Sequence, residues 1–288
     1  GGGSNLLVSD EGLNAVVMRM AMRGREFSEE GETVQLTLGA GESWDAVVTA
    51  ACARGLWGIE NLAGIPGTMG GAAVQNIGAY GAELSDIFSH AEVVDAGTGE
   101  VRRVSREDAR FGYRESRFKK DRTLIVMRVA LTLSRTSAPR TAYADLVRAK
   151  EQGIPLETPD MVATAVRNIR AAKFPDLGLE GTAGSFFKNP VVSAEAASEL
   201  ATRYPGLPCF PEADGRVKVS LAWLLDHALA LKGFSIGKAR LFERQPLVIV
   251  AENGASASDV ETLAREVSAR MRAETGIALE REVESFIA

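Results

Sequence analysis

Apolar and polar residues alternate along some segments of the chain and recur at helical spacing along others. Strict alternation is typical of half-buried strands, and short apolar runs are typical of fully buried ones. We therefore expect strands at residues 15–20, 34–38, 125–133 and 247–250, and a hairpin at 91–104 that turns at 95–99.

Helical spacing, in which apolar residues recur every three or four positions, marks the remaining segments. Ser43 can cap the first helix and Gly55 can end it; the last helix would start at Ser258 in a capping-box pattern with Glu261 and end at Gly276. Further helices are predicted at residues 145–172, with an interruption near 153–155, after Ser193, and at 220–230. This mixture of elements predicts the α+β class, with mostly antiparallel or mixed strands.

Residues 64–81 depart from both patterns because they are rich in glycine. So many glycines are unfavourable in a helix or a regular strand, and we expect a loop system that needs special backbone angles or close backbone approach. A second break lies between residues 173 and 184, where proline and glycine end the helical pattern. We place a domain boundary there, which divides the chain into residues 1–173, 174–276 and a C-terminal segment, 277–288.

Composition narrows the class of protein. The 288 residues suffice for about two domains, and 45% hydrophobic and 25% charged residues are ordinary for a soluble globular protein. The net charge of −5 argues against a nucleic-acid partner. No apolar run approaches the ~20 residues of a membrane span and no signal-peptide pattern is present, so we expect a cytoplasmic protein. Cys52 and Cys209 lack metal-ligand spacing, which favours reduced structural thiols and no metal site.

Two glycine-rich segments are candidates for binding a phosphorylated cofactor. Residues 1–5 (Gly-Gly-Gly-Ser-Asn) can turn successive backbone N–H groups toward an anion, although an engineered linker has a similar composition. They lack the spacing of a Rossmann fingerprint. Residues 64–81 offer many N–H donors and few bulky side chains, so a large cofactor could lie against the backbone. A purely structural glycine loop is the alternative there.

Three further segments carry side chains suited to catalysis. Arg114 lies among aromatic residues at 111–119, where a guanidinium can be held rigidly and offered to a carboxylate. Ser185 lies in the segment 181–190, which does not match the G-x-S-x-G pattern of the hydrolase nucleophile elbow. Neither of the two His residues is obviously placed to complete a Ser-His-Asp triad with it. Glu282 lies in a Leu-Glu-Arg-Glu-Val run near the C-terminus.

In sequence and in order, these five segments closely resemble those of bacterial FAD-dependent UDP-N-acetylenolpyruvoylglucosamine reductases, and the resemblance covers residues 1–282. It implies a flavin-binding domain of the vanillyl-alcohol-oxidase type at 1–173, an α+β substrate-binding domain at 174–276, and a segment at 277–288 that carries a catalytic glutamate. The residues implied in FAD binding are Gly1, Gly2, Gly3, Ser4, Asn5, Gly64, Ile65, Pro66, Gly67, Gly70, Gly71, Ala72, Asn76, Gly78, Ala79, Tyr80 and Gly81.

The resemblance also implies a reaction, the reduction of UDP-N-acetyl-3-O-(1-carboxyvinyl)-glucosamine to UDP-N-acetylmuramate for peptidoglycan synthesis. NADPH would reduce FAD, flavin N5 would give a hydride to the vinyl carbon of the substrate, and Ser185 would protonate the adjacent carbon. Arg114 would hold the substrate carboxylate, and Glu282, if protonated, would supply a hydrogen bond. Lys188 could assist electrostatically or could be a surface residue.

Substrate-binding residues follow from the same resemblance. Residues 141–146 are similar to the additional loop of one type of these reductases, which points to Tyr143 as a residue that closes over the nucleotide sugar. Lys173 would contact the substrate phosphate, and Asn189 occupies another substrate-contacting position. The partners implied are a UDP-sugar and NADPH, and we expect a monomer.

Family members carry an N-terminal segment, including a strand, before the first glycine-rich loop, and this chain starts on that loop. We therefore expect the first flavin-binding subdomain to lack the strand, through a misassigned start or a trimmed chain. Two alternatives remain open: another flavin oxidoreductase of the same fold, and a flavin-binding fragment without catalysis. Turnover with the UDP-sugar and NADPH would distinguish the reductase from the first alternative, and a visible absorption spectrum would test the second.

Overall fold

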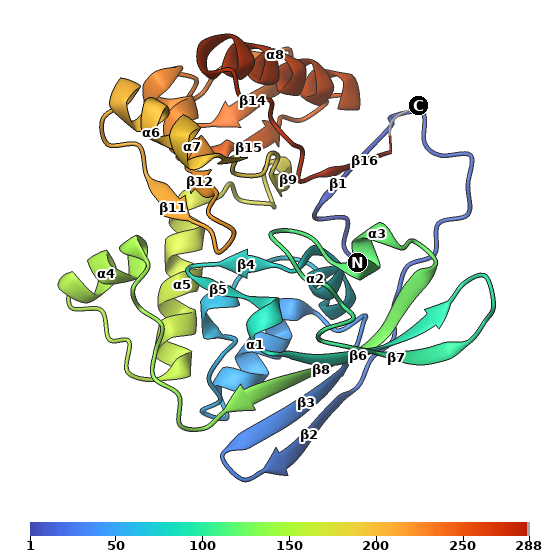
Figure 1. Cartoon of the computed structure of the whole chain (residues 1–288). Coiled ribbons are helices and arrows are strands. Elements are labelled where there is room, and N and C mark those ends of the chain that lie inside the picture. Colours follow the sequence, from blue (N-terminus) through green and yellow to red (C-terminus); the bar gives the residue numbers. More distant parts are fainter. Residues whose placement is uncertain (287–288) are drawn as a thin grey trace. The chain divides into compact units, whose positions relative to one another are not determined.

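The computed structural model describes residues 1–286 and separates into two compact units (Figure 1). Unit 1 contains residues 1–2 and 16–170, and unit 2 contains residues 3–15 and the described residues from 171 onward. Each unit has its own hydrophobic core. The last two residues of the predicted C-terminal segment, 287–288, lie outside the described residues.

Unit 1 is built on a five-stranded antiparallel sheet in the order β2-β3-β8-β6-β7. Its strands are β2 (Arg25–Glu30), β3 (Thr33–Gly39), β6 (Phe88–Asp95), β7 (Val101–Ser105) and β8 (Leu124–Ser134). The predicted strands at 34–38 and 125–133 and the hairpin at 91–104 are confirmed. In β3, the alternation buries Val34, Leu36 and Leu38 in the core, as period-two spacing requires.

The strand predicted at residues 15–20 is wrong. None of these residues pairs with a strand in the described chain, and Val16 is 91% exposed. The polar segment β2 pairs with β3 instead, over six residues. Its Glu29 also forms an ion pair with Arg135 beyond the end of β8, at 2.6 Å. Backbone pairing with a neighbouring strand decides the position of β2, and the apolar pattern does not record it.

The helices of unit 1 supply the rest of its core. They are α1 (Trp44–Cys52), α2 (Met69–Gln75), α3 (Arg117–Lys120), α4 (Ala144–Glu151), α5 (Pro159–Lys173), whose last three residues are assigned to unit 2, and the 3₁₀ turns η1 (Glu60–Leu62) and η2 (Leu84–Asp86). The predicted helix start after Ser43 and the interruption near 153–155 are confirmed. The helix α1 ends at Cys52, and the turn after it closes at Gly55, where Leu56 N donates to Ala51 O at 3.2 Å.

The glycine-rich stretch is not a loop throughout, contrary to the prediction, because α2 lies inside it and includes Gly70 and Gly71. A Cβ on Gly70 would lie 3.0 Å from the Cβ of Ala40, and Gly70 N donates to Ala40 O at 2.8 Å. Close packing on the turn after β3 therefore offsets the low helix propensity of glycine. A short hairpin follows, formed by β4 (Gly78–Ala79) and β5 (Ala82–Glu83).

Unit 2 contains three small sheets, with strand orders β13-β14-β15-β9, β10-β12-β11 and β1-β16. The strands are β1 (Leu6–Val8), β9 (Gly181–Ser185), β10 (Val191–Val192), β11 (Cys209–Pro211), β12 (Val217–Val219), β13 (Ser235–Ile236), β14 (Ala239–Phe242), β15 (Gln245–Ala251) and β16 (Glu284–Phe286). Only β1 and β16 pair in parallel, and the other described pairs are antiparallel. The strand predicted at 247–250 is confirmed within β15.

The helices of unit 2 are α6 (Ala194–Arg203), α7 (Leu221–Trp223), a π-helical turn, η3 (Leu224–Ala228), and α8 (Ala257–Thr275). The predicted starts after Ser193 and Ser220 are confirmed, and both serine side chains accept a backbone N–H there. The helix α8 packs on β13 and β14 and ends at Gly276, as predicted. Its capping box is formed by Ser256 and Asp259, so the predicted box two residues later is wrong.

Candidate active site

In unit 1, the glycine-rich stretch is fixed by the turn that follows β3. Met69 N, at the start of α2, donates to Glu42 O at 2.9 Å. Gly1 lies beside the same point, since a Cβ built on it would be 3.4 Å from Thr68 Oγ1. The structure thus brings Gly1 and the 64–81 stretch together within unit 1, whereas the predicted cofactor-binding residues 3–5 belong to unit 2.

Arg114 is directed back at this stretch. Its Nη2 donates to Gly78 O at 2.6 Å, and its guanidinium carbon lies 5.2 Å from the ring centre of Tyr113. A Cβ on Gly78 would lie 2.8 Å from Arg114 Nη1, so only glycine leaves room for this contact. Buried Ser116 donates to Val74 O at 2.7 Å and ties the arginine-bearing segment to α2. The predicted arginine is therefore held on two sides.

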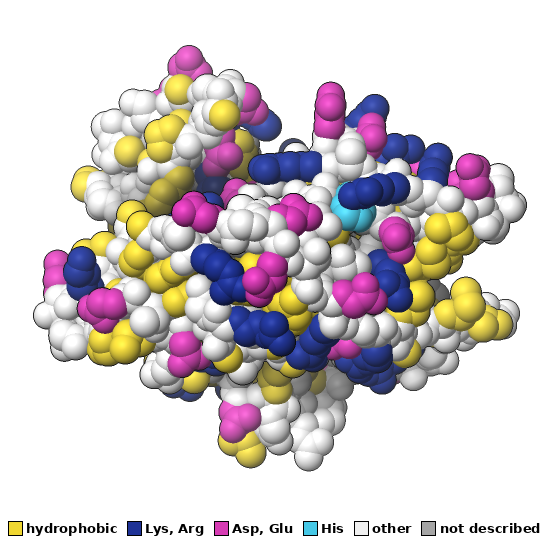
Figure 2. All heavy atoms as spheres, turned by 90° about the horizontal axis from the view of Figure 1, so that it is seen from below, with side chains coloured by type: hydrophobic (Ala, Val, Ile, Leu, Met, Phe, Trp, Pro, Cys, Tyr) yellow, Lys and Arg dark blue, Asp and Glu magenta, His cyan; other side chains and the backbone are white. Residues whose placement is uncertain are grey.

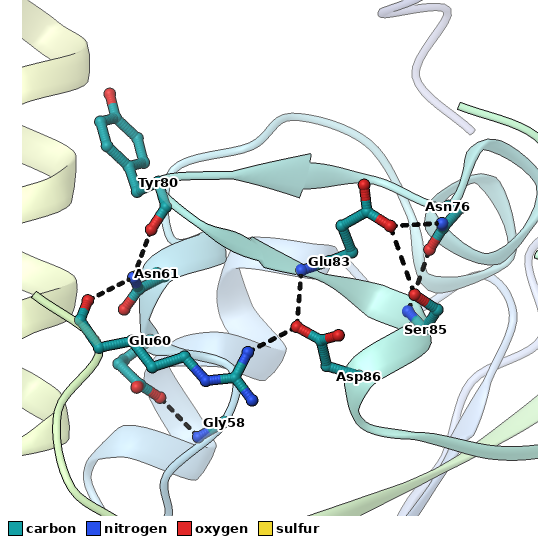
Figure 3. A network of polar contacts seen from close by, with 9 residues as sticks. Gly58, Glu60, Asn61, Asn76, Tyr80, Glu83, Ser85 and Asp86 are labelled. Atoms are coloured by element: carbon teal, nitrogen blue, oxygen red, sulfur yellow. Dashed lines mark hydrogen bonds and ion pairs between the residues drawn. The ribbon is translucent and has the colours of Figure 1, made fainter. Parts of the chain in front are cut away.

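A polar network joins the β4–β5 hairpin to the segment that carries Arg114. Figure 3 shows the side chains of Asn76 and Glu83 directed toward each other. Buried Asn76 donates to Glu83 Oε2 at 3.0 Å and to Gly112 O at 2.9 Å. Gly112 precedes Arg114 by two residues, and Gly78 lies in the hairpin. The network therefore holds both the segment that carries Arg114 and the carbonyl that Arg114 binds.

Tyr80 and Tyr143 form an edge-to-face pair in unit 1, with ring centres 5.3 Å apart. Tyr143 directly precedes α4 and is 42% exposed. Tyr80 is buried, and burial raises the pKa of its hydroxyl to about 12, so the hydroxyl stays protonated at neutral pH. Arg170 is its hydrogen-bond partner. The pair thus presents Tyr143 to solvent against a fixed aromatic neighbour.

In unit 2, Ser185 is the last residue of β9. The carbonyl of the next residue, Phe186, accepts a hydrogen bond from Glu282 N at 2.9 Å. Phe187 forms an antiparallel bridge with Arg281. The segments that carry Ser185 and Glu282 therefore lie side by side, although almost a hundred positions separate them along the chain.

Glu282 is also held by more distant parts of unit 2. Asn5 Nδ2 donates to Glu282 O at 3.1 Å, and Asn5 O accepts from Glu284 N at 3.1 Å. The neighbouring Arg281 forms a two-pronged ion pair with Glu261 of α8, with both N–O distances 2.6 Å. The sequence pattern placed Glu261 in a capping box, and its ion pair with Arg281, 20 residues further along the chain, follows from no local pattern.

The predicted substrate-binding residues Lys173 and Asn189 also belong to unit 2. Lys173 is the last residue of α5, and Asn189 Oδ1 accepts from Leu221 N at 3.0 Å, at the start of α7. Lys188 is buried, and its ammonium lies 2.5 Å from Glu280 Oε1. The alternative that Lys188 is a surface residue is therefore wrong, since it pairs the two segments that carry Ser185 and Glu282.

Cys52 and Cys209 are free, and burial raises the pKa of Cys52 to about 12, which keeps its thiol protonated and unreactive. Within residues 1–286, no group of three or more His, Cys, Asp or Glu side chains could hold a metal ion. No helix of that range is both long and apolar enough to cross a membrane. On the face shown in Figure 2, basic and acidic side chains are interspersed.

Comparisons with known proteins decide the family. Residues 176–286 match the model of the UDP-N-acetylenolpyruvoylglucosamine reductase C-terminal domain, and residues 1–105 match a model of an FAD binding domain. UDP-N-acetylenolpyruvoylglucosamine reductases from Pseudomonas putida and Escherichia coli are each 40% identical to this chain, over 98% of it and over 84% and 82% of their own lengths. The chain belongs to the UDP-N-acetylenolpyruvoylglucosamine reductase family.

Solved structures agree with this assignment to the family. The crystal structure of the UDP-N-acetylenolpyruvylglucosamine reductase from Thermus caldophilus is 27% identical, with a TM-score of 0.63 over 99% of this chain and 83% of that one. The predictions of the family, of an α+β fold with a flavin-binding and a reductase C-terminal domain, and of FAD as the cofactor of an oxidoreductase are confirmed. The roles of individual residues remain predictions.

Proposed function

We propose that this chain reduces UDP-N-acetyl-3-O-(1-carboxyvinyl)-glucosamine to UDP-N-acetylmuramate with NADPH, and that Ser185 donates the proton. The observation that carries the proposal is the backbone pairing beside Ser185, in which Phe186 O accepts from Glu282 N at 2.9 Å. In a chain of this family, it places side by side the two segments that carry the candidate proton-bearing groups. A hydroxyl and a carboxyl held on adjacent segments are suited to protonating and stabilising one carbanionic centre.

The glycine-rich residues of unit 1 fit a flavin nucleotide. A Cβ on Gly2 would meet nothing within 4 Å, and a Cβ on Gly71 would meet only Thr68 Oγ1, at 3.7 Å. The open space beside these two Cα atoms leaves room for a large cofactor to approach the backbone. We infer that residues 1–5 and 64–81 hold FAD. When bound, FAD carries a hydride from NADPH to the terminal vinyl carbon of the UDP-sugar.

Negative charge then develops on the adjacent carbon of the substrate and on its carboxylate, and the remaining chemistry falls to this chain. Arg114 would hold the carboxylate, because its guanidinium is already fixed by Gly78 O and can offer further N–H donors. Glu282, if protonated, would donate a hydrogen bond to the same charge. Ser185 would transfer its proton to the carbanion, for which even a weakly acidic hydroxyl suffices when it is well placed.

The UDP-sugar itself would be bound by Tyr143, Lys173 and Asn189. The exposed ring of Tyr143, directly before α4, supports this role. Lys173, at the end of α5, has a cationic side chain suited to a phosphate. Asn189 is fixed through its Oδ1 at the start of α7. The monomeric state and the cytoplasmic location stay predictions.

Replacing Ser185 by alanine tests the proton transfer. We expect Ser185→Ala to leave the rate of flavin reduction by NADPH near the wild-type value and to slow flavin reoxidation by the UDP-sugar about a hundredfold or more. Stopped-flow absorbance of the flavin measures both rates. Ser198→Ala, on an exposed position of α6, is the matched control. Equal slowing of both half-reactions by Ser185→Ala would mean that the serine is structural and would refute the proposal.

A further inference from the structure

The buried side chain of Asn61 joins two loops of unit 1 that the sequence keeps far apart. Its Nδ2 donates to Tyr80 O at 2.7 Å and to Arg140 O at 2.8 Å. Figure 3 shows the amide of Asn61 below the carbonyl of Tyr80, joined to it by a dashed line. One carbonyl belongs to the glycine-rich stretch, and the other lies three residues before Tyr143. A single amide group therefore anchors both sides of the Tyr80–Tyr143 pair.

The way Asn61 is bonded shows which of its atoms matter. The residue is 1% exposed and both N–H groups of its amide are used, whereas its Oδ1 has no hydrogen-bond partner among the described residues. A buried amide kept for its two donors fits a role as a crosslink between carbonyls. A leucine of similar size would fill the space and would leave both carbonyls without this donor.

A second contact ties the same loop to the β4–β5 hairpin. Arg140 Nη1 lies 2.5 Å from Asp86 Oδ2, and that carboxylate also accepts from Glu83 N at 3.1 Å. Residues 135–143 contain no helix or strand, so no backbone ladder holds the part of the loop near Arg140, and these side-chain contacts anchor it. Glu83 in turn accepts from Asn76. The loop that carries Tyr143 and the hairpin that carries Gly78 thus share one frame.

We propose that Asn61 is a positioning residue, which holds the loop bearing Tyr143 against Tyr80 and thereby presents Tyr143 to the UDP-sugar. The kinetic part of this proposal rests on the proposed function, but the anchoring part does not. Loss of two buried hydrogen bonds should release the loop about tenfold more often, since each bond contributes modestly to the anchored state.

Limited proteolysis of the FAD-loaded protein tests the anchor directly, because trypsin cleaves after arginine and Asn61 binds the carbonyl of Arg140 itself. We expect Asn61→Leu to speed cleavage between Arg140 and Thr141 about tenfold. Cleavage after Arg103, within strand β7, should stay at the wild-type rate and excludes global unfolding. The matched control is Asn168→Leu, the same substitution at an exposed position of α5.

Asp86→Asn is the second variant, which weakens the Arg140 ion pair without touching the buried position, and we expect it to speed the same cleavage about twofold to threefold. For kinetics, we expect Asn61→Leu to raise KM for the UDP-sugar about tenfold and to leave flavin reduction by NADPH unchanged. Unchanged cleavage after Arg140 in Asn61→Leu would overturn the anchor. Faster cleavage with an unchanged KM would overturn the positioning of Tyr143. If the wild-type protein does not turn over the UDP-sugar, the proposed function fails, while the proteolysis still decides the anchor.

Discussion

Replacement of Gly78 by alanine would place a methyl group 2.8 Å from Nη1 of Arg114. Real Cβ atoms do not come this close to a neighbour, so one of the two must move. The methyl group would also lie 3.0 Å from Glu83 Cγ and 3.2 Å from Ala82 O, and this backbone oxygen leaves it little room to shift. Arg114, as the end of a flexible side chain, is the group that will yield, and its 2.6 Å hydrogen bond to Gly78 O will be lost.

The size of the effect follows from the role proposed for Arg114. Charge-assisted hydrogen bonds to a carboxylate contribute about 1.5–3 kcal/mol. If the displaced guanidinium no longer meets the developing charge, the rate of substrate reduction should fall about tenfold to a hundredfold. Stopped-flow measurement of flavin reoxidation by the UDP-sugar gives this rate. Flavin reduction by NADPH should change little, because the substrate carboxylate is absent in that half-reaction.

Gly112→Ala is the matched control, since a Cβ there would meet only Glu115 Cβ, at an ordinary 3.7 Å. It lies two residues from Arg114 and should leave reoxidation within about twofold of wild type. Wild-type reoxidation in Gly78→Ala, with FAD still bound, would refute the argument that the carbonyl of Gly78 sets the position of the arginine. Loss of FAD binding in Gly78→Ala would instead mean that the absence of a side chain at Gly78 serves the cofactor-binding loop.

Three further predictions concern stability and the C-terminal segment. Ser116→Ala leaves Val74 O without its buried donor and should lower the free energy of unfolding of unit 1 by about 1–3 kcal/mol in urea denaturation; an unchanged midpoint would contradict this. Burial raises the pKa of Glu60 above its ordinary value of 4.5, so its stability contribution is lost as pH rises from 4.5 through the raised folded pKa. The free energy of unfolding of Glu60→Gln should therefore rise relative to that of wild type as the pH increases from 4 to 8. Parallel plots of the two free energies against pH would contradict this. Glu261→Gln removes the two-pronged ion pair with Arg281 and should slow substrate reduction more than flavin reduction, which the same stopped-flow assay measures.

Several elements could be predicted from sequence because their causes are local. The hairpin β6–β7, the strand β8, the serine caps of α6 and α7 and the end of α8 at Gly276 each depend on residues within one short window. The same holds for the segments that carry Arg114, Ser185 and Glu282, since their residue order alone indicated the family. Local signals thus identified the family and the candidate catalytic residues.

Other features depend on partners far along the chain and could not be predicted. The capping box of α8 could not be predicted either, because both Ser256–Asp259 and Ser258–Glu261 fit the pattern. The structure uses the first, and Glu261 instead binds Arg281. The helix α2 inside the glycine-rich stretch depends on contact with the turn after β3, and the polar strand β2 depends on its pairing with β3.

The candidate site shows the same division. The pairing of the Glu282 segment with Asn5, 277 positions away, and with Phe186 follows from side-chain and backbone hydrogen bonds that no local pattern records. Asn61 carries no motif, and only its two carbonyl acceptors, 19 and 79 positions away, give it a role. Sequence therefore identifies the reacting groups, and the three-dimensional pairing supplies the residues that position them.

The central claim is tested most directly by turnover of the purified chain after loading with FAD. NADPH oxidation is followed at its near-ultraviolet absorbance with and without UDP-N-acetylenolpyruvoylglucosamine. The account predicts that NADPH is consumed in proportion to the UDP-sugar supplied and that UDP-N-acetylmuramate accumulates in equal amount. A protein that holds FAD but consumes NADPH at the same rate without the UDP-sugar, and forms no UDP-N-acetylmuramate, would contradict it.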